Sequence, residues 1–349
     1  MVIVGIDAHK RTHTAVVIDE AGRRLGEKTT RATTTEANLE LVRWVHALGP
    51  DRRFAVEDCR HLSRRLEADL LAAGEVLVRV PPKMMAHARD AARTYGKSDP
   101  IDALAVARAA LREPNLPVAR LDGPSRELRL LVDHREDLVR DRTAQVNRLR
   151  WHLHELDPSW DPAPRSLVRF KQLDALAARL HGVEGTLAWV AQDLVGRIRE
   201  LTVAVNELER RISEVVSRLA PALLELAGVG SLTAAKILAE VADVRRFHSK
   251  DAFARHNGTA PLPVWSGNRV RHRLSRTGNR QLNAAIHRIA VTQMRIHDGA
   301  KAYLERRIAI GNTKTEAIRA LKRKLSDVVY RRLLADAEAT PVAPLGEAA

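Results

Sequence analysis

Apolar residues at the start of the chain follow the pattern of a buried strand. Residues 2–6 are apolar almost without a break, as in a strand that is covered on both faces of a sheet. Two more strands are predicted at 14–19 and 23–30, separated by a short turn that contains Gly22. Three strands joined by short connections predict an antiparallel meander.

Helical and extended segments alternate over the next fifty residues. Apolar positions at helical spacing predict helices over 39–48 and 62–71, and short apolar runs predict strands at 54–57 and 76–80. The order of elements is therefore βββαβαβ. A parallel strand that follows a crossover helix usually lies beside the first strand, so the pattern predicts an α/β domain with a mixed sheet.

Two of these strands end in acidic residues. Asp7 follows the first apolar run, and Glu57 ends the strand at 54–57. A carboxylate beside a buried strand is costly unless a metal ion, a basic partner or backbone amides compensate it. Glu57 is expected beside Asp7 at one edge of the sheet. Asp58 competes for this role, but it fits more naturally into the following turn.

A third acidic group opens a predicted helix in the segment KSDPIDA, residues 97–103. Pro100 at the first helical position makes Asp99 the N-cap and Asp102 the third helical residue, on one face of the first turn. Acids at these positions are also ordinary helix-start residues, which is the alternative interpretation. If the four carboxylates meet, they repel one another unless divalent cations neutralise them. Two magnesium ions at such a site would activate an attacking oxygen and stabilise the leaving oxygen of a phosphodiester.

Composition indicates an anionic polymer as the partner. The 349 residues include 58 Lys and Arg against 43 Asp and Glu, a formal net charge of +15. Nucleic acid is the simplest such partner, and an anionic membrane surface is the alternative. No apolar run is long enough to span a bilayer and no leader segment is visible, so we expect a cytoplasmic protein that has no membrane as a partner. The single cysteine excludes intramolecular disulfides and a cysteine-based zinc cluster.

The middle of the chain predicts two long helices. Apolar residues repeat every three or four positions over 125–156 and again, close to heptad spacing, over 187–215. Residues 157–164 are rich in proline and must form a loop. This pattern predicts an antiparallel hairpin or coiled-coil arm, which serves as a spacer or presents basic side chains to nucleic acid. The basic positions on the first helix are Arg140, Arg142, Arg148 and Arg150.

Glycines interrupt the next helical segment, residues 221–243. Gly228 and Gly230 stand between two apolar helical runs, as in a helix-hairpin-helix, and Ser231 begins the second run. Such glycines let the backbone approach a phosphate, and the free amides of the helix start bind it. The alternative is a glycine turn between two packed helices.

The densest basic stretch covers residues 245–280 and predicts a phosphate-binding surface. Within it, Ser266 lies in a loop bounded by proline and glycine. That is a suitable setting for a nucleophilic hydroxyl, because the loop gives access and the cations stabilise developing charge; a structural serine is the alternative. The arginines expected to bind nucleic acid are Arg269, Arg271, Arg273, Arg276 and Arg280. Residues 288–332 are again helical and basic, and a disordered tail is expected over 336–349.

Four of these features together resemble one protein family. GIDAHK at 5–10, Glu57, KSDPIDA at 97–103 and the stretch around Ser266 are similar to the DEDD transposases of the insertion sequence one-ten family. The resemblance implies a RuvC-like, ribonuclease H-like α/β domain, a helical or coiled-coil arm and a mostly α-helical carboxy-terminal domain containing the serine. The corresponding ranges are 1–115, 116–220 and 221–335, followed by the tail.

The resemblance also implies roles for residues. Asp7, Glu57, Asp99 and Asp102 match the acids that bind two Mg²⁺ ions, and Ser266 with Gly267, Arg269 and the Gly278-Asn279 pair matches the serine motif. In that family the serine attacks a DNA phosphate and holds it as phosphoserine, and the acids and the serine can come from different subunits of a dimer or tetramer. A non-coding guide RNA pairs with donor and target DNA. This sequence departs from the family at Asp58-Cys59-Arg60, where small residues are more common, and at Asn283, where arginine is frequent.

Two other functions are compatible with the same residues. One is a RuvC-type, structure-selective nuclease in which the acids activate water and Ser266 is structural. The other is a non-catalytic nucleic-acid-binding scaffold in which the acids cap helices and form turns. The fourteen histidines show no ligand spacing, so His9 and His13, which flank the first acid, are interpreted as surface or core residues.

Overall fold

The computed structural model describes residues 1–339 except 32–33, 59, 82–83, 86–97, 117, 120–122, 267–268 and 274–277. At 60–61, 264–266 and 269–273 it describes the backbone alone. The chain divides into two compact units, Met1–Leu121 and Asp122–Ala349. Among the described residues, no helix is both long enough and apolar enough to cross a membrane.

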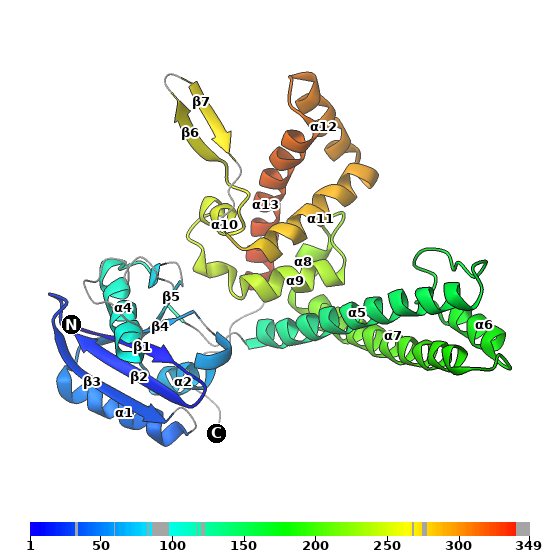
Figure 1. Cartoon of the computed structure of the whole chain (residues 1–349). Helices are drawn as coiled ribbons and strands as arrows, with labels where there is room; N and C mark the ends of the chain where they lie inside the picture. The colour runs from blue at the N-terminus through cyan, green and yellow to red at the C-terminus, as the bar shows by residue number, and fades with distance from the viewer. Residues whose placement is uncertain are drawn as a thin grey trace. The chain divides into compact units, whose positions relative to one another are not determined.

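The first unit is built on a five-stranded sheet with the order β3-β2-β1-β4-β5 (Figure 1). β2 pairs antiparallel with both β1 and β3, whereas β4 runs parallel to β1 and to β5. This confirms the predicted βββαβαβ order and the ribonuclease H-like fold class. The strands are β1 (Val2–Ala8), β2 (Thr12–Ile18), β3 (Arg24–Arg31), β4 (Arg52–Glu57) and β5 (Leu77–Val80).

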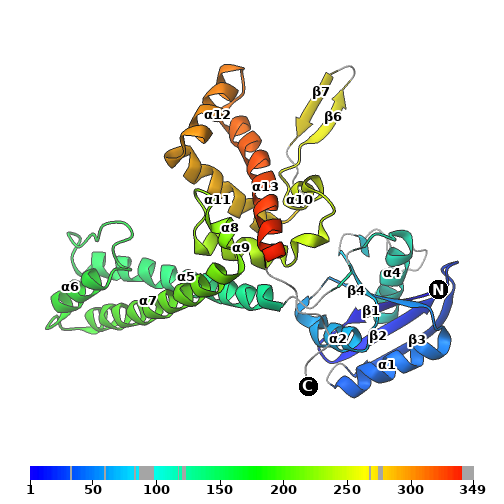
Figure 2. The same ribbon diagram turned by 180° about the vertical axis from the view of Figure 1, so that it is seen from behind.

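Helices cover both faces of this sheet. α1 (Thr35–Leu48) and α2 (Arg60–Ala72) lie on one face, and α4 (Asp99–Arg112) lies on the other (Figure 1 and Figure 2). Successive residues of β1 pack alternately into the two cores on either side of the sheet, because neighbouring residues of a strand point to opposite faces. Val4 and Ile6 pack in the core under α1 and α2, while Ile3 packs in the core under α4.

Gly5 allows α4 to lie directly on β1. A Cβ atom built on Gly5 would clash with the carbonyl oxygen of Ala103 and the amide nitrogen of Ala107, and would lie 2.8 Å from the Cβ of Ala107. The lack of a side chain at this position therefore sets how closely the helix approaches the strand. Because Asp7 lies two residues further along β1, it faces the same side of the sheet, below the start of α4.

The second unit begins with the predicted arm, and its long helices run antiparallel. Arg135 of the first long helix donates to Glu209 of the second at 2.9 Å, and Arg142 donates to Thr202 at 3.3 Å. Higher residue numbers on the first helix therefore lie opposite lower residue numbers on the second. A short helix at the tip was not predicted. The elements of the arm are α5 (Gly123–Leu156), α6 (Phe170–Leu180) and α7 (Thr186–Leu219).

The base of the arm is part of the helical core of the second unit. Leu128 of α5 and Val216 of α7 are fully buried in the same cluster as Ile237, Ile289 and Val329 from the later helices. The remaining elements are α8 (Pro221–Leu224), α9 (Ser231–Val241), the 3₁₀ turn η1 (Val244–Arg246), α10 (Lys250–His256), β6 (Leu262–Ser266), β7 (Arg269–Arg273), α11 (Arg280–Ile296), α12 (Asp298–Ala309) and α13 (Lys314–Ala339).

The last helix extends into the region expected to be a disordered tail. The carboxylate of Asp336 is buried and accepts hydrogen bonds from the backbone amides of Ala222 and Leu223, at 2.7 and 3.1 Å. These bonds satisfy free amides at the start of α8 and hold the end of α13 in place. Residues 336–339 therefore belong to the helix, and the rest of the expected tail, 340–349, lies outside the described residues.

A methyl group at Gly5 should separate α4 from the sheet. We expect Gly5→Ala to lower the free energy of unfolding of the first unit by about 3 kcal/mol, because the clash is with backbone atoms that cannot rotate away. Hydrogen exchange of β1 and α4 peptides, with urea unfolding, measures this. Gly196→Ala is the control: it lies within α7 with no atom within 4 Å of the new methyl group, so a gain of up to about 1 kcal/mol is expected. Unchanged exchange in β1 and α4 would contradict the prediction.

Candidate functional site

The ends of β1 and β4 place two of the predicted acids side by side in the sheet. The parallel register pairs Ile6 with Val56, so the next residues on the two strands, Asp7 and Glu57, are neighbours at the same edge. Asp7 is 7% exposed and Glu57 is half-buried. Among the described residues, Glu57 does not belong to the group of ligand atoms within 4.8 Å of one another that includes Asp7.

Helix α4 begins one residue earlier than expected. Ser98, in an extended conformation with φ −153° and ψ 153°, is the N-cap, and its carbonyl accepts the first helical hydrogen bond from the Asp102 amide at 3.0 Å. Asp99 is therefore the first helical residue and not the cap, which corrects the expectation. The carboxylate of Asp99 instead reaches a side chain of the β1 segment.

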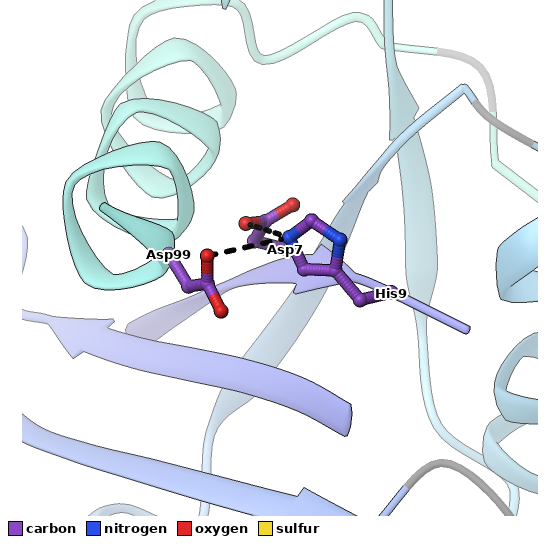
Figure 3. A group of neighbouring side chains, drawn as sticks. All are labelled: Asp7, His9 and Asp99. Atoms are coloured by element: carbon purple, nitrogen blue, oxygen red, sulfur yellow. Dashed lines mark hydrogen bonds and ion pairs between the residues drawn. The ribbon is translucent and has the colours of Figure 1, made fainter. Parts of the chain in front are cut away.

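That side chain is His9. Its Nε2 atom lies 3.0 Å from Oδ2 of Asp7 and 3.4 Å from Oδ1 of Asp99 (Figure 3). The three ligand atoms all lie within 4.8 Å of one another. Two segments that are about ninety residues apart in the sequence therefore meet at one point.

The surroundings of Asp7 disfavour its ionised form, chiefly because the side chain is buried. Burial raises the pKa of Asp7, His9 lowers it through its charge and hydrogen bond, and the charges of Asp102 and Asp99 raise it further; the net pKa is above the ordinary value. Asp102 is itself 9% exposed, so its charge acts on Asp7 through the protein interior.

These residues fit a divalent cation. Carboxylate oxygens are the ligands that Mg²⁺ and Mn²⁺ prefer, and a bound cation would favour the ionised form of Asp7, whose pKa is raised mainly by burial. Asp7 and Asp99 thus have the chemistry and the proximity for such a site, whereas Asp102 is not among the described side chains whose ligand atoms lie within 4.8 Å of one another here.

Sequence reasoning missed His9. Its position two residues after Asp7 was a usable signal, because alternate residues of an extended chain face the same side. His13 does match one of its two interpretations: it is a core residue of β2, 1% exposed.

The same segments that build the site are matched by models of known families. A model of DEDD transposases of the IS110 type matches residues 4–158, and a second model, of the transposase IS116/IS110/IS902 family, matches residues 220–305. The chain belongs to the IS110 family of transposases. The first match contains most of β1, all of β4 and all of α4, and the second contains the β6–β7 hairpin with Ser266.

Individual relatives of this IS110-family transposase extend over nearly its whole length. It is 28% identical to the uncharacterized 44.8 kDa protein of insertion element IS116 from Streptomyces clavuligerus, over 99% of this chain and 98% of that protein. It is also 28% identical to the 42 kDa protein of insertion element IS900 from Mycobacterium paratuberculosis, over 94% of each chain. Among solved structures, RuvC of Thermus thermophilus in complex with a Holliday junction matches 34% of this chain and 99% of its own, with 15% identity and a TM-score of 0.27.

In the second unit of the transposase, the two glycines of the helix-hairpin-helix segment differ in their surroundings. A Cβ atom on Gly228 would lie 3.3 Å from the Ile289 carbonyl oxygen, so this glycine packs against α11, and its φ of 86° suits glycine. Gly230, at the N-cap of α9, has no atom within 4 Å of such a Cβ. Ser231 shares a 3.0 Å hydrogen bond with Ser213 of α7. This packing favours a glycine turn between packed helices as the role of Gly228. The space beside Gly230 is compatible with a close approach of a phosphate to the backbone.

Ser266 lies at the end of a strand, not in the expected loop. β6 and β7 form an antiparallel hairpin in which Ser266 pairs with Arg269 (Figure 1). Two paired strands are favoured because residues 262–265 are apolar and mostly β-forming, and because arginine alternates with Val270 and His272 over 269–273. Arg271 and Arg273 lie further along β7, and Arg280 begins α11. Arg276, together with Gly267, is outside the described residues.

The Gly278-Asn279 pair fixes the return of the hairpin to the helices. Gly278 has φ 112° and lies against the carbonyl oxygen of His256, where a side chain would clash. The side chain of Asn279 accepts from the Leu282 amide at 2.9 Å and donates to Glu240 at 2.6 Å, so it caps α11 and ties it to α9. These residues anchor one end of the segment that carries Ser266.

Replacing Asp7 should stabilise the protein while removing cation binding. Because its folded-state pKa is raised, the folded protein holds this proton more tightly than the unfolded chain, so ionisation of Asp7 lowers stability as pH rises above the ordinary carboxyl range. We expect metal-free Asp7→Asn to unfold at a higher temperature than the wild type at pH 7. Added Mg²⁺ should raise the midpoint of the wild type and not that of the variant.

The matched control is Glu113→Gln, which removes one negative charge at the other, exposed end of α4. It should leave the response to Mg²⁺ unchanged. An Asp7→Asn variant that is less stable than wild type and still stabilised by Mg²⁺ would contradict the prediction.

Buried His13 should make the first unit sensitive to acid. Burial, followed by the charge of His9, lowers the pKa of His13 from 6.5 to about 4. The unfolded chain therefore binds a proton before the folded protein does, and stability falls as pH decreases from about 6.5 towards 4. Between pH 7 and pH 5 the loss is about 2 kcal/mol. His13→Gln should lose about that much less stability than wild type in urea unfolding, whereas His46→Gln, at an exposed position of α1, should match wild type.

Proposed function

We propose that this IS110-family transposase cuts and rejoins DNA, with Asp7, Glu57, Asp99 and Asp102 as ligands of two Mg²⁺ ions and Ser266 as the nucleophile. The observation that carries the proposal is the meeting of β1 and the first turn of α4, which brings Asp7 and Asp99 to the same imidazole nitrogen. Helix capping alone does not account for it, because Ser98 is the cap and Asp99 points elsewhere.

Each acid has a distinct position in the proposed site. Asp7 and Asp102 are buried, while the side chain of Asp99 is 51% exposed and is open to solvent. Glu57, one strand over, completes the set from the neighbouring strand end. Divalent cations bound here would activate the attacking oxygen and stabilise the leaving oxygen of a phosphodiester.

Ser266 is proposed to form the covalent link to DNA. Its hydroxyl oxygen would form a bond to the phosphorus atom while one P–O bond of the DNA backbone breaks. The hydroxyl proton is lost, and the leaving oxygen takes up a proton. The position of Ser266 opposite Arg269, in a hairpin that also carries Arg271 and Arg273, supports this role, because guanidinium groups stabilise charge that develops on phosphate.

DNA and a guide RNA are the proposed partners, with a dimer or tetramer as the active assembly. The net charge of +15 supports a polyanionic partner, and the family resemblance supports the RNA and the assembly. Sequencing of RNA that copurifies with the protein tests the guide: one enriched structured RNA from the insertion sequence is expected, and a random sample of cellular RNA would contradict it.

The nucleophile is tested by substitution on a DNA substrate that carries the ends of the element. Ser266→Ala should reduce strand cleavage by at least about a thousandfold and abolish the detergent-resistant protein–DNA adduct, since the attacking atom is lost. Ser275→Ala, in the same basic segment, is the control and should behave as wild type. Cleavage by Ser266→Ala at the normal rate without an adduct would indicate water as the nucleophile, as in a RuvC-type nuclease.

The catalytic role of the acids is tested with two variants and one control variant. Glu57→Gln and Asp102→Asn should abolish cleavage while preserving DNA binding, whereas Asp58→Asn should retain cleavage, because Asp58 lies beyond the strand end. Full cleavage and cation binding in both Glu57→Gln and Asp102→Asn would leave the acids with a structural role only.

A further inference from the structure

His9 holds a position that the four-acid site does not explain. Figure 3 shows its ring, carried by the segment just after β1, with one nitrogen directed at both Asp7 and Asp99. Among the described residues, this is the one group of three His, Cys, Asp or Glu side chains whose ligand atoms come within 4.8 Å of one another.

We propose that Nε2 of His9 is a ligand of the cation bound by Asp7 and Asp99, and that this nitrogen makes the site prefer Mn²⁺ to Mg²⁺. The inference rests on the proposed function only in that it assumes a cation at these acids. It adds an imidazole to a site otherwise made of carboxylates.

The spacing of the ligand atoms supports a shared ion. Neighbouring ligands of an octahedral ion with bonds of about 2.1 Å lie about 3 Å apart. The distances from Nε2 to the two carboxylate oxygens are 3.0 and 3.4 Å. A single N–H group donates one well-directed hydrogen bond, so it accounts for the contact with Asp7 more readily than for both contacts.

Accessibility supports the same role. The side chain of His9 is 49% exposed and that of Asp99 is 51% exposed, whereas that of Asp7 is 10% exposed. The group is thus anchored by one buried carboxylate and open on the side of His9 and Asp99. A cation can enter from solvent, and a substrate oxygen can reach it without moving the sheet.

The expected selectivity follows from ligand chemistry. Mg²⁺ is a hard ion that is held almost entirely by oxygen. Mn²⁺ also binds carboxylates and has the lowest affinity of the divalent first-row transition metals, but it accepts imidazole nitrogen more readily than Mg²⁺ does. A site of carboxylates alone would distinguish Mn²⁺ from Mg²⁺ less strongly. Loss of the imidazole should therefore weaken Mn²⁺ binding more than Mg²⁺ binding.

Electron spin echo envelope modulation of Mn²⁺ bound to the full-length protein tests this directly, since a coordinated imidazole imposes ¹⁴N modulation on the signal. We expect this modulation in wild type and its loss in His9→Ala and His9→Gln, with Mn²⁺ affinity reduced at least about tenfold and Mg²⁺ affinity reduced less. His46→Ala, which removes an exposed histidine of α1, is the control and should retain both the modulation and the affinity. Far-ultraviolet circular dichroism checks that the variants are folded.

The outcomes separate this inference from the proposed function. Mn²⁺ that binds wild type and is lost in Asp7→Asn, but shows no ¹⁴N modulation, would overturn the role of His9 and leave the carboxylate site intact. Modulation that persists in His9→Ala would also overturn it, because another nitrogen would then be the ligand. Absence of Mn²⁺ and Mg²⁺ binding in wild type would instead overturn the proposed metal site itself.

Discussion

The contact between α4 and β1 at Gly5 is the constraint on which the first unit depends. Most helices that cover a sheet are held off it by side chains from both surfaces, but here helix backbone rests on strand backbone. This close contact determines where the acids of α4 lie. The start of α4 is brought over the end of β1, so that Asp99 reaches His9 and the charge of Asp102 acts on Asp7. A larger residue at position 5 would move the whole group apart.

Bringing these acids together opposes stability. Burial and the like charges of Asp102 and Asp99 both disfavour the ionised form of Asp7, and His9 offsets this only in part. Burial of the hydrophobic core around the site offsets this loss of folding free energy. Ile3, Val16 and Val106 are almost fully buried between the sheet and α4. Such a conflict between local electrostatics and fold stability is typical of sites that bind a ligand of opposite charge. The fold holds the Asp7 and Asp99 carboxylates close together although their like charges oppose it.

In the second unit, a helix cap holds one end of the segment that contains Ser266. The β6–β7 hairpin contains Ser266, and its return to the helices is fixed by Asn279, which caps α11 and donates to Glu240. The arm is anchored in the same core through Leu128 and Val216, so the hairpin and the arm share one helical base.

Local patterns were sufficient for much of this protein. Apolar runs predicted the strands of the first unit but not those of the β6–β7 hairpin, and helical spacing predicted α5 and α7. Acids at the end of β1 and in the first turn of α4 indicated where chemistry could occur. These features depend on neighbours in the sequence. Tertiary structure alone decided the rest. That His9 faces Asp99, that Gly228 packs against α11 and that Asp336 binds the amides of α8 all depend on segments more than sixty residues apart, whose approach is set by packing and not by local sequence.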